Sequence, residues 1–230
     1  MQIEILETIE GARQARGLTV IIDVFRAFSL EPYLFARGAK EILAVGAKET
    51  ALALGKAHPD YILCGERQGV KLPGFDYGNS PSQTADADLA GRTVVHTTSA
   101  GTQGLVAAVG ADEIITGSLV NARAVADYIR KKNPAQVSLV AMGLHGLYSA
   151  PEDVLAARYI RSLLEDHPLD MEKELARLRQ TESAKRFFRP ENAQVFPQGD
   201  YELSTAVDVF DFVLKVRKEE EDIFRVSKGE

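Results

Sequence analysis

A unit of strand, polar loop, helix, Gly-Ala turn and strand occurs twice in the first half of this sequence. The first copy spans Leu18–Ile42 and has Asp23 at the end of its first apolar run. The second spans Thr93–Ile114, and its closing Gly-Ala-Asp-Glu-Ile segment parallels Gly-Ala-Lys-Glu-Ile in the first. Strands that alternate with helices favour a layered sheet whose faces are covered by helices. The repeat therefore predicts an α/β fold that contains two similar units.

The remaining elements follow from local patterns. Short runs rich in β-branched residues predict six strands: Leu18–Ile22, Glu41–Val45, Tyr61–Cys64, Thr93–His96, Glu113–Thr116 and Val137–Met142. Helical spacing and capping signals predict helices over Pro32–Arg37, Lys48–Ala57, Thr102–Val109 and Asn121–Lys132, and another from Pro151 to about His167-Pro168.

Less regular segments lie around these elements. Gly65–Leu89 is rich in glycine and proline, and we interpret it as a long irregular loop that is either functional or mobile. Leu169–Phe188 is charged and predicts a second, exposed helix. Tyr201–Val216 has an apolar face and predicts a last helix, and we expect the charged tail Lys218–Glu230 to fray.

Composition excludes several functional classes. The chain has 230 residues, of which 45% are hydrophobic, and a formal net charge of −6 without a long basic run. Nucleic acid is therefore not an expected partner. The only cysteine, Cys64, excludes an intramolecular disulfide framework. The N-terminus has no signal-peptide pattern and no stretch is long enough to span a membrane, so we expect a cytoplasmic protein.

Two acid–arginine pairs follow predicted strands. Asp23 and Arg26 come after the first strand, and Glu66 and Arg67 come after Tyr61–Cys64. In open α/β sheets, ligands gather at the carboxyl ends of strands. A carboxylate there can coordinate Mg²⁺, and a guanidinium can bind a phosphate or carboxylate group. The alternatives are a helix cap for Asp23 and a surface ion pair for Glu66 and Arg67.

Two further segments offer hydrogen-bond donors to an anion. Thr97–Thr102 follows a strand and opens a helix, where hydroxyls and free backbone N–H groups attract phosphate. The turn-rich octapeptide Gly74–Pro81 contains Asn79 and Ser80. The alternatives are an ordinary N-terminal capping run and a well-formed Asx turn.

Glu152 and Asp153 begin the helix that follows Val137–Met142, and they are further candidate metal ligands. The alternative is a capping box between Ser149 and Glu152, with acidic residues favoured by the helix dipole. Phosphatase routes through phosphocysteine, aspartyl phosphate or phosphohistidine lack their sequence patterns here: Cys-x5-Arg, Asp-x-Asp and Arg-His-Gly. Metal-assisted attack by water remains the economical mechanism.

In their order along the chain, these segments resemble the 2-phosphosulfolactate phosphatase family. The matching blocks are Asp23–Ala27, Gly65–Arg67, Gly74–Pro81, Thr97–Thr102, Gly117–Ala122 and Glu152-Asp153. The resemblance implies a three-layer α/β/α fold of two similar, fused halves, approximately 1–90 and 91–230, within one phosphatase domain. It also implies Mg²⁺-dependent hydrolysis of (2R)-2-phospho-3-sulfolactate to 3-sulfolactate and phosphate, a step on the route to coenzyme M in methanogenic archaea.

On this basis we assign roles to the candidate residues. The resemblance implies a Mg²⁺ site formed by Asp23, Glu66, Glu152 and Asp153. Arg26 and Arg67 would neutralise a small anionic, phosphorylated substrate, so the catalytic set is Asp23, Arg26, Glu66 and Arg67. The predicted substrate-binding residues are Asn79, Ser80, Thr97, Thr98, Ser99, Gly101 and Thr102.

Three alternatives stay open at this stage. One is a phosphatase of another small phosphorylated hydroxy acid, and one is a non-catalytic module that binds a phosphorylated or sulfonated metabolite without a metal. The third is a structural domain whose loops are only caps and turns, which explains two acid–arginine pairs at separate strand ends poorly. The oligomeric state is also open, a homo-oligomer included.

Overall fold

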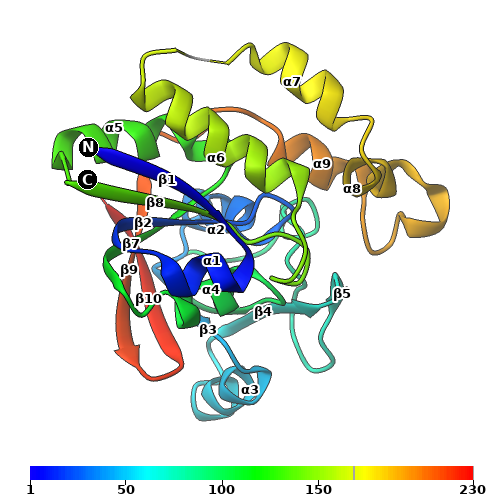
Figure 1. The fold of residues 1–230 in the computed structure, drawn as a ribbon. Coiled ribbons are helices and arrows are strands. Elements are labelled where there is room, and N and C mark those ends of the chain that lie inside the picture. Colours follow the sequence, from blue (N-terminus) through cyan, green and yellow to red (C-terminus); the bar gives the residue numbers. More distant parts are fainter. Residues whose placement is uncertain (168, 230) are drawn as a thin grey trace.

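A computed structural model describes residues 1–167 and 169–229, and it shows a ten-stranded sheet with helices on both faces (Figure 1). This confirms the predicted three-layer α/β/α architecture. The strand order is β1-β8-β2-β7-β9-β10-β3-β6-β4-β5.

The sheet consists of two parallel groups joined by a hairpin. One group contains β1 (Gln2–Glu7), β8 (Gln136–Ala141), β2 (Gly17–Ile22) and β7 (Ala111–Gly117). The other contains β3 (Glu41–Val45), β6 (Thr93–Thr97) and β4 (Ile62–Arg67), with β5 (Val70–Lys71) antiparallel at its edge. The antiparallel hairpin of β9 (Val213–Glu220) and β10 (Ile223–Gly229) pairs with β7 on one side and β3 on the other.

The two repeat units interleave in this sheet. The first unit runs from β2 through α2 (Ala27–Ala36) to β3, and the second runs from β6 through α4 (Gly101–Ala107) to β7. Strand β2 pairs with β7, and β3 pairs with β6, so each unit contributes one strand to each parallel group. The loops that follow the first strands of both units therefore belong to opposite halves of the sheet.

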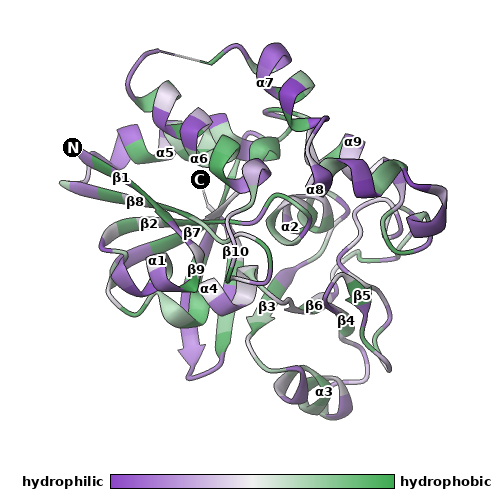
Figure 2. Ribbon diagram, turned by 45° about the vertical axis from the view of Figure 1, so that its right-hand side comes forward, coloured by the Kyte–Doolittle hydropathy of each residue, from purple (hydrophilic) through white to green (hydrophobic). Residues whose placement is uncertain are grey.

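Helices cover the sheet according to their apolar faces. One face packs against α1 (Thr8–Gln14), α2 and α4 in a core that includes Phe28, Leu34 and Leu105. The opposite face is covered by α5 (Ala122–Lys132) and α6 (Pro151–Leu164) over the first group, and by α3 (Lys48–Ala57) over the second. Figure 2 shows hydrophilic and hydrophobic residues alternating around α5, α6 and α7 (Met171–Leu178), as expected for helices with one face on the core.

The segment between α7 and the hairpin contains short helices. They are α8 (Glu182–Lys185), three-residue 3₁₀ turns at Arg186–Phe188 and Pro190–Asn192, and α9 (Gln198–Ser204). The aromatic rings of Phe25, Phe187 and Tyr201 pack together there, with ring centroids 4.9 Å apart for Phe25 and Phe187. This small core attaches the segment to the loop that follows β2.

All six predicted strands are confirmed, but the C-terminal predictions were wrong. Tyr201–Val216 is not one helix, because α9 ends at Ser204 and β9 begins at Val213. The tail does not fray; Lys218–Gly229 lies within the central hairpin. The sequence patterns also did not predict β1. The segment Gly65–Leu89, which we expected to be a loop, contains the end of β4 and all of β5. These strands depend on partners distant in sequence, so local patterns do not reveal them.

Several predicted helix boundaries also changed. The predicted helix Pro32–Arg37 is the second half of α2, which begins at Ala27. Leu169–Phe188 forms α7, α8 and a 3₁₀ turn rather than one helix. The helix from Pro151 ends at Leu164, and Pro168 lies outside the described residues. Within residues 1–167 and 169–229, no helix has the length and apolar character needed to cross a membrane.

The central hairpin should be essential to stability. Leu214 of β9 is fully buried in the core shared with α1, α2 and α4, so we expect Leu214→Ala to lower the free energy of unfolding by about 2–5 kcal/mol. Urea unfolding followed by circular dichroism measures this change. Lys218→Ala, at an exposed position of the same strand, should change stability by no more than about 0.5 kcal/mol. Equal small effects of both substitutions would contradict a buried, central hairpin.

Candidate active site

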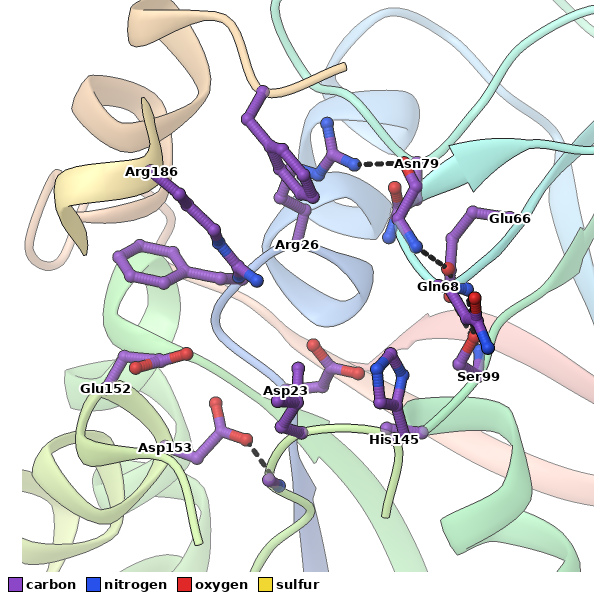
Figure 3. A pocket seen from close by; sticks show the side chains of 16 residues that line it. Asp23, Arg26, Glu66, Gln68, Asn79, Ser99, His145, Glu152, Asp153 and Arg186 are labelled. Atoms are coloured by element: carbon purple, nitrogen blue, oxygen red, sulfur yellow. Dashed lines mark hydrogen bonds between the residues drawn. The ribbon is translucent and has the colours of Figure 1, made fainter. Parts of the chain in front are cut away.

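A cavity of about 260 Å³ lies where loops from both halves of the sheet meet (Figure 3). Its wall contains four acidic residues, predicted from the sequence as metal ligands: Asp23, Glu66, Glu152 and Asp153. All four are buried. In Figure 3, Arg186 and Glu152 lie on one side of the cavity, Glu66, Gln68 and Ser99 lie on the other, and Asp23 lies between them. The structure thus brings together residues that are up to 173 positions apart, from Asp23 to Phe196.

Backbone N–H groups hold the two aspartates in place. Asp153, in the first turn of α6, accepts hydrogen bonds from the N–H of Val24 and of Gly143, both at 2.7 Å. Because Val24 follows β2 and Gly143 follows β8, this carboxylate connects the ends of two neighbouring strands. Asp23 accepts from the N–H of Gly101 at 2.9 Å and thereby connects the end of β2 to the start of α4.

Gly101 acts through its backbone and its lack of a side chain. A Cβ at this position would lie 3.0 Å from Oδ2 of Asp23 and 3.1 Å from the ring of Phe28. Glycine therefore permits the close approach that the hydrogen bond to Asp23 requires. In the structure this hydrogen bond uses the Gly101 N–H that we predicted as a substrate donor.

Glu66 organises the opposite wall. Its carboxylate accepts from the N–H of Ser99 and of Gly69, each at 2.6 Å, and from the Ser99 hydroxyl at 3.1 Å. These bonds connect the end of β4 with the loop between β6 and α4. Ser99 therefore lines the cavity with its hydroxyl already donated to Glu66.

Glu152 does not form the predicted capping box. The residue that caps α6 is Ala150, without a side-chain cap, and the Glu152 carboxylate instead accepts from the Ser183 hydroxyl at 2.7 Å. The α8 segment thus reaches the cavity, and it orients the Glu152 side chain from 31 residues away. A local capping pattern at Ser149 and Glu152 cannot reveal a partner so distant in sequence.

The cavity carries more negative charge than its hydrogen bonds compensate. Burial, followed by repulsion from Glu66, raises the pKa of Asp23 to about 7. Burial also raises the pKa of Asp153 well above its ordinary value, with Asp23 and Glu152 adding repulsion. The pKa of Glu152 is raised as well, chiefly by burial. Such clusters of perturbed carboxyl groups in a cleft are characteristic of functional sites.

Both arginines predicted to bind substrate are engaged by the protein. Arg26 is buried; its guanidinium forms an ion pair with Asp200 at 2.7 Å and also donates to the carbonyls of Val195 and Gly69. Arg67 is absent from the cavity wall and donates to the carbonyls of Glu66 and Gly46 and to the Thr97 hydroxyl. Their position therefore favours a role in holding loops around the cavity.

Most of the predicted hydroxyl donors also lie in the supporting structure. Ser80 donates to Asp200 at 2.7 Å, and Thr97 donates to the carbonyl of Gly46. Thr98 and Thr102 bond each other, since the side chain of each accepts from the backbone N–H of the other. Asn79 does line the cavity, and its buried Oδ1 has no hydrogen-bond partner among the described residues.

The sequence did not identify Arg186, Gln68 or His145 as site residues. All three line the cavity. His145 has a positive φ of 57° in the tight loop after β8, which directs it toward the site. Arg186 belongs to a charged stretch that shows no spacing signal, so a single sequence offers no means of selecting it.

A Mg²⁺ ion in this cavity would have at most two carboxylate ligands among the described residues, rather than the four predicted from the sequence. Within residues 1–167 and 169–229, no three His, Cys, Asp or Glu side chains converge closely enough to hold a metal ion. Mg²⁺ is commonly bound through one or two carboxylates, with water and substrate phosphate completing its shell. Asp23 and Asp153 suit this arrangement because they are neighbouring, buried, and retain lone pairs beyond those used by N–H groups.

Removal of Asp200 should expose how much the site depends on its buried ion pair. Asp200→Ala leaves the Arg26 charge buried without a partner, so we expect a loss of about 3–5 kcal/mol in the free energy of unfolding. Asp60→Ala, at an exposed position, is the matched control. Urea unfolding measures both. A loss below about 1 kcal/mol for Asp200→Ala would show that the pair is not a structural anchor.

The raised pKa of Asp23 predicts a pH dependence of stability. The folded state holds a proton on Asp23 up to about pH 7, whereas the unfolded state releases it near pH 4. In metal-free buffer this group therefore lowers stability as pH rises from about 4 to about 7, by up to about 1.4 kcal/mol per pH unit. Asp23→Asn removes the effect, so the wild type should lose stability relative to this variant over that range. Parallel curves from chemical unfolding at several pH values would refute the assignment.

Comparison with known proteins connects this geometry to a family. Residues 3–219 match the family described as 2-phosphosulpholactate phosphatase. A probable 2-phosphosulfolactate phosphatase of Bacillus subtilis is 30% identical over 224 residues, which is 96% of each chain. Proteins of the same description from Carboxydothermus hydrogenoformans and Thermoplasma acidophilum are 40% and 34% identical over 71% and 67% of this chain, and 68% of each of theirs.

The matched region includes every residue of the cavity, from the strand-end carboxylates to Arg186 and Phe196. It also includes nearly the whole sheet and all the helices that cover it. This chain is therefore a member of the 2-phosphosulfolactate phosphatase family, whose activity is that of a phosphoric monoester hydrolase.

Proposed function

We propose that this protein is a Mg²⁺-dependent phosphatase that hydrolyses (2R)-2-phospho-3-sulfolactate to 3-sulfolactate and phosphate. Family membership supports the reaction class and the substrate. The main support for metal dependence is that three carboxyl groups are buried in one cavity and have raised pKa values. They belong to Asp23, Asp153 and Glu152. Negative charge concentrated in this way is stabilised by a divalent cation and an arginine, and it repels an anionic substrate in their absence.

Asp23 and Asp153 are the proposed ligands of the ion, since N–H groups of Gly101, Val24 and Gly143 fix their carboxylates. Mg²⁺ bound there supplies charge for the phosphoryl oxygens and lowers the pKa of water. Glu66 and Glu152 support the site through Ser99 and Ser183. The Arg26–Asp200 pair maintains the loop at Gly69 and the segment at Val195 around the substrate.

The first experiment is phosphate release from 2-phosphosulfolactate and a panel of other phosphorylated hydroxy acids, with Mg²⁺ and with EDTA. We expect release that requires Mg²⁺ and is fastest for 2-phosphosulfolactate. Asp23→Asn should lower kcat/KM by at least about 100-fold, because charge stabilisation by a metal ion contributes several kcal/mol. Asp60→Asn is the control at an exposed position.

A binding measurement separates the metal site from turnover. Mg²⁺ alone should raise the thermal unfolding midpoint of the wild type at pH 7.5, and this rise should be lost in Asp23→Asn and Asp153→Asn. No release from any compound by a folded, Mg²⁺-supplied sample would favour a binding module over an enzyme. Full activity in EDTA would defeat the metal assignment.

A further inference from the structure

Arg186 is a cation in the cavity wall that the protein itself leaves available. It follows α8 and lines the same cavity as Asp23, Glu152 and Asp153. Its Nε is buried and has no hydrogen-bond partner among the residues that the structure describes. None of the ion pairs or side-chain hydrogen bonds among residues 1–167 and 169–229 involves its guanidinium. A buried donor without a partner carries a free-energy cost that a bound ligand can remove.

The other two candidate arginines, unlike Arg186, have hydrogen-bond partners within the protein. Arg26 donates three hydrogen bonds and is neutralised by Asp200, and Arg67 donates three hydrogen bonds to the protein outside the cavity wall. The charge of Arg26 is thus compensated, whereas no described residue pairs with the charge of Arg186 at hydrogen-bond distance. The substrate therefore has one unpaired guanidinium to meet among the described residues of this cavity.

Aromatic rings hold the Arg186 guanidinium in place. Its Cζ lies 4.7 Å from the ring centroid of Phe196 and 5.2 Å from that of Phe187, distances typical of cation–π contacts. Such packing limits the rotamers of the side chain without using its N–H groups. Ordering before binding reduces the entropy lost when a ligand binds.

We propose that Arg186 binds an oxyanion of the substrate, the role that the sequence led us to expect of Arg26 and Arg67. The proposal rests on the proposed phosphatase function and extends it by naming the residue that recognises the anion. Phosphoryl, sulfonate and carboxylate groups all match the planar fork of a guanidinium. The transferred phosphoryl group and the two acid groups that stay on the product are therefore possible sources of the same chemistry.

Two substrates distinguish these sources. 2-Phosphosulfolactate carries a carboxylate and a sulfonate besides its phosphoryl group, and glycerol 2-phosphate carries only the phosphoryl group. Arg186→Gln should lower kcat/KM for 2-phosphosulfolactate by about 10- to 100-fold, the loss expected for charged hydrogen bonds. If glycerol 2-phosphate loses the same factor, Arg186 binds the phosphoryl group. If the loss with glycerol 2-phosphate is below about 3-fold, Arg186 binds the carboxylate or the sulfonate and determines specificity.

Arg189→Gln is the matched control, because Arg189 is exposed, lies three residues away and pairs with Glu182 outside the cavity. Arg186→Lys should recover only part of the activity, since an ammonium group lacks the bidentate geometry. Urea unfolding of all variants shows whether the fold is intact. Unchanged kcat/KM in a folded Arg186→Gln protein would overturn the proposal.

Anion binding by Arg186 can be tested without measuring turnover. Inorganic phosphate and inorganic sulfate should each raise the thermal unfolding midpoint of the wild type and of Arg189→Gln above that in sodium chloride of equal ionic strength. Arg186→Gln should lose this rise. If no compound is hydrolysed but this pattern holds, the phosphatase function fails while the anion site stands. An equal rise in Arg186→Gln would overturn the anion site itself.

Discussion

Two buried aspartates joined to backbone N–H groups are the constraint on which the active site depends. Asp153 connects the ends of β2 and β8, and Asp23 connects the end of β2 to the start of α4. Each bond compensates part of a buried negative charge, and together they hold four chain segments at one point: the ends of β2 and β8 and the starts of α4 and α6. Burial, together with repulsion from neighbouring carboxylates, raises the pKa of both aspartates and makes the cavity suitable for a cation. Structural support and chemical function therefore reside in the same carboxylates.

A second buried contact attaches the C-terminal segment to this point. The Arg26–Asp200 ion pair connects the loop after β2 to α9, and the Phe25, Phe187 and Tyr201 rings pack beside it. This attachment brings Arg186 and Ser183 to the cavity, where Ser183 donates to Glu152. The segment thus completes a site whose other parts come from strand ends. Truncation of the chain after α6 would remove both the anchor and the unpaired guanidinium.

Local patterns predicted the parts of the molecule whose causes are local. The repeat, the six strands and the positions of Asp23 and Glu66 at strand ends follow from apolar runs and the residues that end them. The alternation of strands and helices likewise indicated the layered architecture. The capping box at Glu152 failed because a hydroxyl from another helix competes for that carboxylate. Lys218–Gly229 was misinterpreted because its exposed charges conceal the sheet partners on either side of the hairpin.

Residue types and their order were enough to indicate an α/β fold, a cavity at strand ends and an acidic, phosphate-handling chemistry. The sequence did not indicate which arginine faces the ligand. The three arginines of this region have the same side chain, and their roles differ because their partners differ. Asp200 pairs with Arg26, and backbone carbonyls accept hydrogen bonds from Arg67. Arg186 packs against aromatic rings, which leave its N–H groups free. Those partners lie far apart along the chain, so the assignment follows from packing in three dimensions rather than from local sequence.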